Sequence, residues 1–168
     1  MSISTLIITA GALVPRGRGI LAADESTGTI GKRFDGIQLE STEDTRRDYR
    51  EMLFIASGIE EHISGVILYD ETIRQSSAAG TPLPKVLSDK GIIPGIKVDT
   101  GLSDLAGCPG EQVTEGLDGL RARLLEYGQL GARFAKWRAV YSVGEGLPGD
   151  TCVKANAQTL ARYAALCQ

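Results

Sequence analysis

The sequence predicts an α/β fold in which a mostly parallel β-sheet is covered by helices. Short, nearly continuous apolar segments alternate with segments of helical periodicity, which is typical of buried parallel strands joined by helices. Charged residues directly follow the apolar segments, and this edge of a parallel sheet is where such folds bind ligands. The chain has 168 residues, enough for one domain with a real hydrophobic core.

The first strand is expected over residues 19–23, where Gly-Ile-Leu-Ala-Ala precedes Asp24. A helix is expected after Ser41-Thr42, because these residues can supply an N-cap and acidic residues follow in the first turn. Gly58 is the predicted end of this helix. Helical spacing of apolar residues predicts that its inward face contains Tyr49, Met52, Leu53 and Ala56.

Two further strands follow a similar pattern. The second is expected over residues 65–69, before Asp70-Glu71, and a stretch punctuated by glycine and proline comes next. The third is expected over residues 92–98, although Pro94 disfavours a strand near its start.

The last third of the chain predicts a helix, a strand and a helix. The fourth strand is expected over residues 132–140, ARFAKWRAV, between two helices. The inward face of the helix before it is predicted to contain Val113, Leu117, Leu120, Leu124 and Tyr127. The inward face of the last helix is predicted to contain Val153, Ala157, Leu160, Ala161 and Ala164.

Composition excludes several classes of function. The net charge of −3 and the few aromatic residues argue against a nucleic-acid-binding surface, and no apolar run approaches the roughly 18 residues of a membrane helix. The three cysteines show no CxxC spacing, so neither a disulfide framework nor a zinc site is expected. We therefore expect a cytoplasmic protein without a metal or a cofactor.

Several residues at strand ends could carry chemistry. Asp24 is followed by hydroxyl residues and flexible backbone, so it could orient a substrate, but the same segment could be a solvated turn or helix cap. Lys97 could bind an anion or pair with a nearby acid. The pair Arg46-Arg47 lies in the first turns of its helix, where it could bind an acid or a phosphate, or form surface charge.

Lys136 and Arg138 are expected on one face of the fourth strand, since side chains alternate along a strand. If this face points into a binding site, the neighbouring cation lowers the pKa of the lysine and the arginine suits a phosphate. The alternative is an edge strand with both cations in solvent.

The number of strands limits the architecture. The segment GRGILA matches the pattern GxGxxA of a dinucleotide-binding motif. Such a motif must follow a strand, and this segment precedes one, so a dinucleotide-binding fold is disfavoured. A closed barrel needs eight strands and typically about 250 residues, and this sequence predicts four. The chain therefore resembles half of a barrel.

Taken together, the motifs GILAADESTGTIGKRF, EDTRRDYREMLF, GVILYDET, GIKVDTG and ARFAKWR resemble class I fructose-bisphosphate aldolase, the Schiff-base, metal-independent kind. The resemblance extends from about Leu13 to Gln168, and the segment before Leu13 is less regular than in the family. It implies a (β/α)₈ TIM barrel, with residues 1–168 as the N-terminal half of a single domain that supplies roughly the first four βα units. It also implies a homotetramer that cleaves fructose 1,6-bisphosphate to dihydroxyacetone phosphate and glyceraldehyde 3-phosphate, in glycolysis and gluconeogenesis.

The resemblance also implies roles for individual residues. Asp24 would orient a substrate hydroxyl near the bond that breaks, and Lys136 would assist proton transfers around the carbinolamine and the imine. The substrate, a phosphorylated sugar with two anionic ends, needs cations and hydroxyls around it. The residues implied to contact it are Ser26, Thr29, Arg33, Arg46, Lys97 and Arg138.

The motif resembling EGxLLKP, which carries the Schiff-base lysine in this family, does not occur in the sequence. The resemblance therefore implies that the nucleophilic lysine lies beyond this chain and that the chain alone is inactive. We expect it to pair with a complementary C-terminal half or to self-associate. The alternative is a non-catalytic half barrel that binds sugar phosphates.

Overall fold

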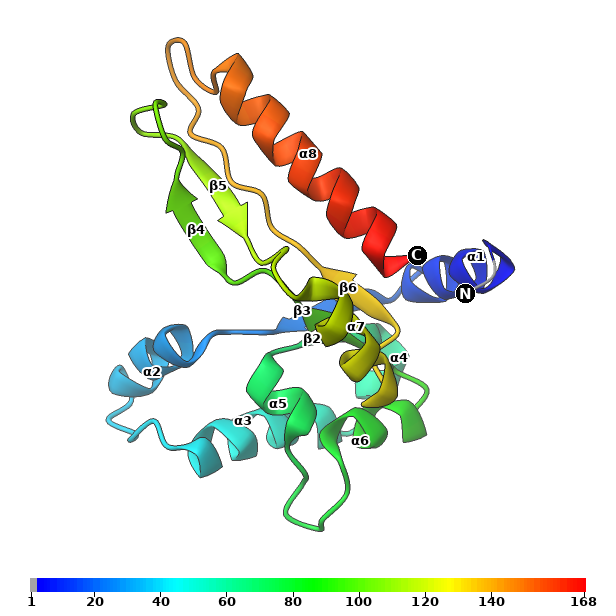
Figure 1. Ribbon diagram of the computed structural model, residues 1–168. Helices are drawn as coiled ribbons and strands as arrows, with labels where there is room; N and C mark the ends of the chain where they lie inside the picture. Colours follow the sequence, from blue (N-terminus) through cyan, green and yellow to red (C-terminus); the bar gives the residue numbers. More distant parts are fainter. Residues whose placement is uncertain (1–2) are drawn as a thin grey trace. The chain divides into compact units, whose positions relative to one another are not determined.

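The computed structural model describes residues 3–168 and contains alternating helices and strands (Figure 1). The helices are α1 (Ile3–Leu13), α2 (Thr27–Asp35), α3 (Glu43–Ile55), α4 (Ile59–His62), α5 (Asp70–Arg74), α6 (Leu83–Asp89), α7 (Leu120–Gln129) and α8 (Asp150–Cys167). The strands are β1 (Gly19–Ala23), β2 (Ile63–Leu68), β3 (Ile93–Lys97), β4 (Gly101–Asp104), β5 (Gln112–Glu115) and β6 (Phe134–Lys136). The first of two compact units contains the described residues up to Lys97 and Tyr127–Ala135, and the second contains Val98–Glu126 and Lys136–Gln168.

The main sheet has the strand order β1-β2-β3-β6. β1 is parallel to β2, and β2 is parallel to β3, with Ala22 opposite Ile67 and Ile67 opposite Gly95. The parallel sheet predicted from the sequence is therefore present, and β1 has the predicted bounds. Pro94 belongs to β3, and its carbonyl accepts a hydrogen bond of 2.9 Å from the backbone N–H of Arg133.

A close approach between strands explains two glycines of this sheet. A Cβ atom at Gly95 would overlap the ring of Phe134, and one at Gly65 would lie 3.2 Å from the same ring. The ring therefore lies over backbone at Gly95 that only glycine leaves open, whereas at Gly65 the nearest obstacle to a Cβ atom is the side chain of Leu13, at 2.6 Å. This packing fixes where the start of β6 meets the sheet.

Helices α3, α5 and α6 form the helical layer of the first unit (Figure 1). α5 and α6 pack against β3, and α6 also packs against α3. The core between these elements is made of branched aliphatic side chains, as expected for a parallel sheet covered by helices. The fully buried members include Val66, Leu68, Ile96, Leu83 and Leu87.

The inward face of α3 differs from the prediction. Its buried residues are Arg46, Arg50 and Phe54, which recur every four positions. Met52, predicted to face inward, is 57% exposed. The prediction counted apolar residues only, so it missed a face on which two arginines precede a phenylalanine.

The second unit contains a hairpin that the sequence analysis did not predict. β4 and β5 pair antiparallel, with Leu102 opposite Thr114. Val113 lies in β5 and the helix begins only at Leu120, so the predicted helical face was wrong at its start. β5 has only four residues, Gln-Val-Thr-Glu, of which one is apolar, and so short a segment cannot be assigned to a strand or a helix by periodicity.

Helix α8 packs against β5 in the same unit. Its buried residues are Cys152 and Asn156, one turn apart. Val153, predicted to face inward, is 41% exposed, and Ala157 is also exposed. The predicted inward face of α8 was therefore wrong by about one residue in phase.

Helix α1 begins at Ile3 and ends at Leu13, so the described residues of this irregular segment are helical. No residue of α1 is buried, and its large apolar side chains Ile3, Ile7 and Ile8 are each at least 67% exposed. Its last residue is attached to the sheet, because the hydroxyl of Ser64 donates a 2.6 Å hydrogen bond to the carbonyl of Leu13.

None of the described helices combines the length and the apolar character needed to cross a bilayer.

Candidate functional site

Asp24 is the residue at which β1 ends and the chain turns toward α2. It follows the buried Ala23 and is itself only 7% exposed. A carboxylate held at the carboxyl end of a parallel strand has the position that α/β folds use for chemistry. The structure thus places Asp24 as an acidic group in a largely enclosed setting.

Two predicted contact residues form the start of α2. Ser26 is the N-cap, and its hydroxyl accepts a hydrogen bond from the backbone N–H of Thr29. The two hydroxyls also lie 3.0 Å apart. The segment is therefore a helix cap, which is the structural alternative that the sequence left open. It also presents two hydroxyls at a helix N-terminus, where the helix dipole favours an anion.

Arg33 lies one turn after Thr29 on the same helix. Its guanidinium donates a hydrogen bond to the carboxylate of Glu25, and its side chain remains 57% exposed. Arg33 thus lies on the same helix as the cap and is paired with an acid in this structure.

Arg46 forms a two-point ion pair with Glu71. Its Nε lies 2.8 Å from Glu71 Oε2 and its Nη2 lies 2.5 Å from Oε1, while Nη1 donates to the carbonyl of Ser41. The residue is 9% exposed, and the hydrogen bond with Glu71 raises the pKa of Arg46. Of the three readings of this arginine, the structure shows it bound to an acid.

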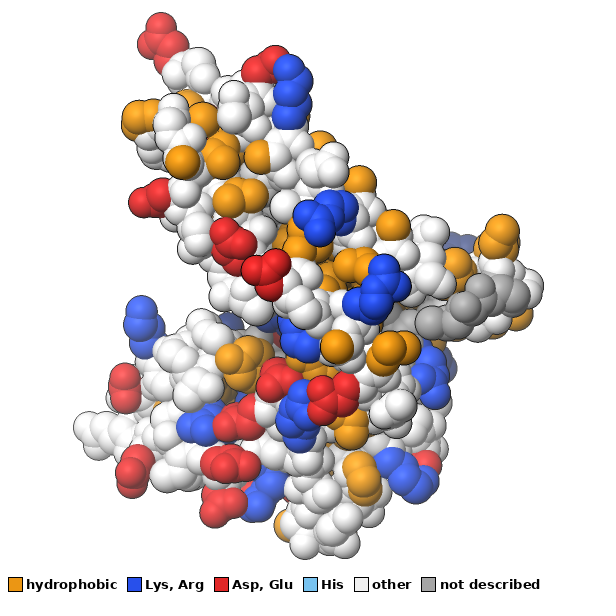
Figure 2. All heavy atoms as spheres, viewed as in Figure 1, with side chains coloured by type: hydrophobic (Ala, Val, Ile, Leu, Met, Phe, Trp, Pro, Cys, Tyr) orange, Lys and Arg blue, Asp and Glu red, His pale blue; other side chains and the backbone are white. Residues whose placement is uncertain are grey.

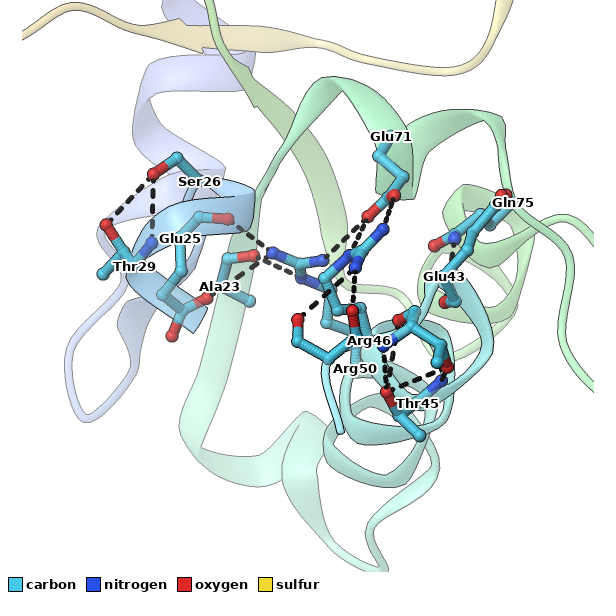
Figure 3. A network of polar contacts seen from close by, with 12 residues as sticks. Ala23, Glu25, Ser26, Thr29, Glu43, Thr45, Arg46, Arg50, Glu71 and Gln75 are labelled. Carbon is cyan, nitrogen blue, oxygen red and sulfur yellow. Dashed lines mark hydrogen bonds and ion pairs between the residues drawn. The ribbon is translucent and has the colours of Figure 1, made fainter. Parts of the chain in front are cut away.

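Arg50 is a site-forming residue that the sequence analysis missed. It is fully buried, and its guanidinium donates to the carbonyl of Ala23 at 3.2 Å and to that of Glu25 at 2.6 Å (Figure 3). Burial lowers the pKa of Arg50, against the opposing effect of the carboxylates of Glu25 and Glu71. The signal was available, since Arg50 follows Arg46 by four residues on a helix.

Lys97 is the last residue of β3 and is half-buried. It therefore stands at the same carboxyl edge of the sheet as Asp24. Asp24, Ser26, Thr29, Arg33, Arg46 and Lys97 all belong to the first compact unit.

Lys136 and Arg138 belong to the second unit. Lys136 is half-buried and ends β6, and its carbonyl accepts a hydrogen bond of 3.1 Å from the backbone N–H of Val98. Arg138 lies beyond the strand, is exposed, and accepts a hydrogen bond of 2.6 Å at its carbonyl from the hydroxyl of Thr114. Residues 137–140 are not in the strand, so the prediction that both cations share a strand face was wrong.

The residue between these two cations is fixed by α8. The rings of Trp137 and Tyr163 lie 5.4 Å apart. Burial is the main reason that the pKa of the Tyr163 phenol is raised well above its usual range. This contact anchors the chain directly after Lys136.

Acidic and basic side chains are interspersed on the face seen in Figure 2, without a broad patch of one sign. This face therefore offers no basic surface for a polyanion. Within residues 3–168, no three side chains of His, Cys, Asp or Glu are grouped so that they could hold a metal ion.

Comparison with known proteins adds an independent result. The model of the family described as "Fructose-bisphosphate aldolase class-I" matches residues 5–168. A probable class 1 fructose-bisphosphate aldolase of Xylella fastidiosa is 61% identical over 168 residues, which are 100% of this chain and 50% of that protein. A cytosolic fructose-bisphosphate aldolase of Arabidopsis thaliana is 53% identical over 163 residues, 97% of this chain and 46% of its own length.

A solved structure gives the same picture. The fructose-bisphosphate aldolase of Plasmodium falciparum, crystallised with TRAP and a small-molecule inhibitor, has a TM-score of 0.95 and 49% sequence identity. The alignment covers 98% of this chain and 48% of that one. The chain thus spans about half the length of the relatives that it matches.

Proposed function

Because the chain belongs to the class I fructose-bisphosphate aldolase family, we propose that it supplies half of an aldolase active site. Residues 1–168 would form the N-terminal half of one TIM-barrel domain, and the active site would cleave fructose 1,6-bisphosphate to dihydroxyacetone phosphate and glyceraldehyde 3-phosphate. The observation that carries this proposal is the family match over residues 5–168 in a chain half as long as its relatives. Glycolysis and gluconeogenesis are the pathways that this reaction would serve.

Asp24 and Lys136 are the proposed catalytic residues. Asp24 would orient the substrate hydroxyl next to the carbon–carbon bond that breaks, a role supported by its burial at the end of β1. Lys136 would move protons around the carbinolamine and the imine. The amine that forms the imine would be a lysine of the other half of the barrel.

The proposed substrate contacts are cations and hydroxyls that suit phosphate groups, namely Ser26, Thr29, Arg33, Arg46, Lys97 and Arg138. Arg33 and Arg46 are each paired with a carboxylate in this structure, from Glu25 and Glu71 respectively. We expect Arg33, whose side chain is 57% exposed, to exchange its acid for a phosphate more readily than the enclosed Arg46.

Borohydride trapping tests whether the lysine that forms the imine lies in the other half of the barrel. The chain is incubated with dihydroxyacetone phosphate and sodium borohydride, alone and with the C-terminal half of a relative, and the products are digested for mass spectrometry. We expect the reduced adduct only on the added half. An adduct on this chain, for instance at Lys136, would contradict the proposal, and Lys136→Met is the control for that site.

We also propose that the working protein is a cytoplasmic oligomer, a tetramer as the family resemblance implies. The relatives named as cytosolic support the location. The exposed Ile3, Ile7 and Ile8 of α1, together with Ile20 on the edge strand β1, support association with a complementary half or a second copy. Light scattering after size exclusion tests this proposal. It is contradicted if the chain has the mass of one copy when it is alone and the same mass after the C-terminal half of a relative is added.

A non-catalytic half barrel that binds sugar phosphates is the second candidate. Six of the eight proposed site residues lie in the first compact unit, which favours substrate binding by that unit alone. Calorimetric titration with fructose 1,6-bisphosphate separates the two functions. Binding without any cleavage after addition of the other half favours the binding module, and cleavage favours the enzyme.

A further inference from the structure

We propose that Arg50 is a positioning residue for Asp24. Its buried guanidinium holds the carbonyls on both sides of Asp24 and thereby fixes the direction in which this carboxylate leaves β1. The inference rests on the proposed function, because it takes Asp24 as the group that acts on the substrate.

The geometry around Asp24 is the first support. The side chain of Arg50 extends from α3 to the end of β1, where Nε donates to the Ala23 carbonyl at 3.2 Å and Nη2 to the Glu25 carbonyl at 2.6 Å (Figure 3). These carbonyls belong to the residues immediately before and after Asp24. One side chain therefore holds the peptide group directly before Asp24 and the second peptide group after it, between Glu25 and Ser26.

The chemistry of the guanidinium makes this clamp rigid. Its N–H groups lie in one plane with fixed directions, so the two carbonyls must keep their relative orientation to accept both bonds. Rotation of the Ala23–Asp24 peptide or of the Glu25–Ser26 peptide would break one of them, so the short segment that contains Asp24 is held at both ends. A lysine in the same place has one flexible ammonium group, so it could reach one carbonyl but would not fix the angle between the two.

The guanidinium is itself held by acids on two sides. Its Nη2 lies 3.9 Å from Glu25 Oε2, and its Nη1 lies 3.8 Å from Glu71 Oε2. Glu71 is in turn fixed by its two-point pair with Arg46, and the ring of Tyr69 lies 5.9 Å from the guanidinium carbon. Arg50 is thus the centre of a network that joins β1, α3 and α5.

The cost of this arrangement argues against simple space filling. Arg50 is fully buried, and within the described residues its Nη1 has no hydrogen-bond partner. A buried arginine is an expensive way to fill a core, since an apolar side chain of similar volume often stabilises a protein as well or better. Its donated bonds converge on the peptides around a single proposed catalytic residue, and this assigns Arg50 a role in placing that residue.

The kinetic consequence differs from that of a binding residue. Arg50 is fully buried, so we expect it to make no contact with the substrate, and its loss should misplace Asp24 in the reaction without weakening substrate affinity. Its effect should also depend on Asp24 being present. Both properties can be measured.

The first experiment uses the chain by itself. Arg50→Met and Arg50→Lys are compared with Arg47→Met, which removes a partly exposed arginine of the same helix whose partners are Asp44 and Asp48. We expect amide hydrogen exchange at residues 24–26 to accelerate about tenfold in Arg50→Met and less in Arg50→Lys, with β2 and the Arg47→Met chain unchanged. Unchanged exchange at residues 24–26 in a folded Arg50 variant overturns the proposal.

The second experiment measures cleavage by the chain assembled with the C-terminal half of a relative. We expect Arg50→Lys to lower kcat about 30-fold while KM stays within about twofold, because misplacing a reacting group by about 1 Å can cost 100-fold in rate. In an Asp24→Asn background the same change should lower the residual kcat less than about threefold, since coupled residues are not additive. An equal loss in both backgrounds means that Arg50 does not act through Asp24.

The outcomes separate this proposal from the proposed function. If the unmodified chain is inactive with the added half, the proposed function fails, and hydrogen exchange alone decides whether Arg50 orients Asp24. If Arg50→Met does not fold, Arg50→Lys and Glu71→Gln provide the same comparison, because Glu71→Gln weakens the hold on the guanidinium without removing it.

Discussion

Helices α3 and α8, one in each compact unit, both use polar residues on their inward faces, but with different chemistry. On α3, Arg46 and Arg50 bind carbonyls and the carboxylate of Glu71. On α8, Asn156 donates to the carbonyl of Gln112 at 3.1 Å, and Cys152 donates weakly to the same carbonyl. The first helix is held by charged groups, and the second by neutral ones.

The difference shows what each attachment needs. A buried guanidinium needs acidic groups nearby to offset the loss of its hydration. The α3 network therefore connects three elements, and its stability depends on every member. The neutral amide of Asn156 donates to a carbonyl of one strand and brings no charge into the interior, although its Oδ1 is buried without a hydrogen-bond partner among the described residues. Charged attachment suits a place where a catalytic group must be held at one angle, and neutral attachment suits ordinary packing.

The largest expected effect tests the apolar end of the α3 face. Phe54 is fully buried one turn after Arg50, so Phe54→Ala should lower the free energy of unfolding by about 4 kcal/mol, through lost burial and a cavity. Met52→Ala, at a residue 57% exposed, should change it by less than about 0.5 kcal/mol. Urea unfolding followed by circular dichroism measures both, and equal losses would mean that the inward face was assigned to the wrong residues.

Removal of the ion pair between Arg46 and Glu71 should lower the free energy of unfolding almost as much. Arg46→Met leaves the half-buried carboxylate of Glu71 without its two-point partner and should destabilise the chain by about 3 kcal/mol. Adding Glu71→Gln removes the uncompensated charge and should recover at least half of that loss. A double variant no more stable than Arg46→Met would show that the pair is not the source of the effect.

Removal of the hydrogen bonds of Asn156, which attach α8 to β5, should lower the free energy of unfolding by a smaller amount. Asn156 donates to the carbonyls of Gln112 and Cys152, so Asn156→Ala should lower the free energy of unfolding by about 1.5 kcal/mol. Its exposed neighbour Ala157 provides the control through Ala157→Ser. If Asn156→Ala is as damaging as Arg46→Met, the contrast between charged and neutral attachment is wrong.

The smallest effect is one of reactivity. Burial, with the nearby carboxylate of Glu111 adding to it, raises the pKa of the Cys152 thiol, so at pH 8 less of it is thiolate than in a free cysteine. Iodoacetamide should therefore label Cys108, which is partly exposed, at least about tenfold faster than the buried Cys152. Mass spectrometry of timed samples measures this ratio, and equal rates would show that α8 opens readily from β5.

Much of the fold was predictable because strands and their order depend on apolar runs. The family indicated by the motifs is confirmed by the match over residues 5–168, and the aldolase neighbour with a TM-score of 0.95 supports the predicted fold class. Strand β1 has the predicted bounds, and the charged residue after it, Asp24, lies at the predicted edge. These features depend on local composition, which a single sequence contains.

The helix faces were less predictable because apolar periodicity ignores polar residues that turn inward. Arg50 has a long aliphatic stem, and its charge is stabilised by backbone carbonyls and by the carboxylates of Glu25 and Glu71, which are far from it in sequence. Asn156 is inward because the carbonyl of Gln112 faces it. The end of β6 at Lys136 likewise depends on backbone pairing with Val98, so Arg138 could not be placed by strand alternation.

Phe134 covers two glycines, Gly65 and Gly95, on neighbouring strands. β6 has only three residues, too few for backbone pairing alone to choose one alignment. The ring occupies space that these two glycines leave open at diagonal positions of the strand pair, since Gly65 is opposite Ile93 and Gly95 is opposite Ile67. The alignment of the strand that ends in Lys136 is therefore constrained by the shape of the sheet, because a Cβ atom at Gly95 would overlap the ring where it now lies, and a slip of one residue would turn the ring to the other face.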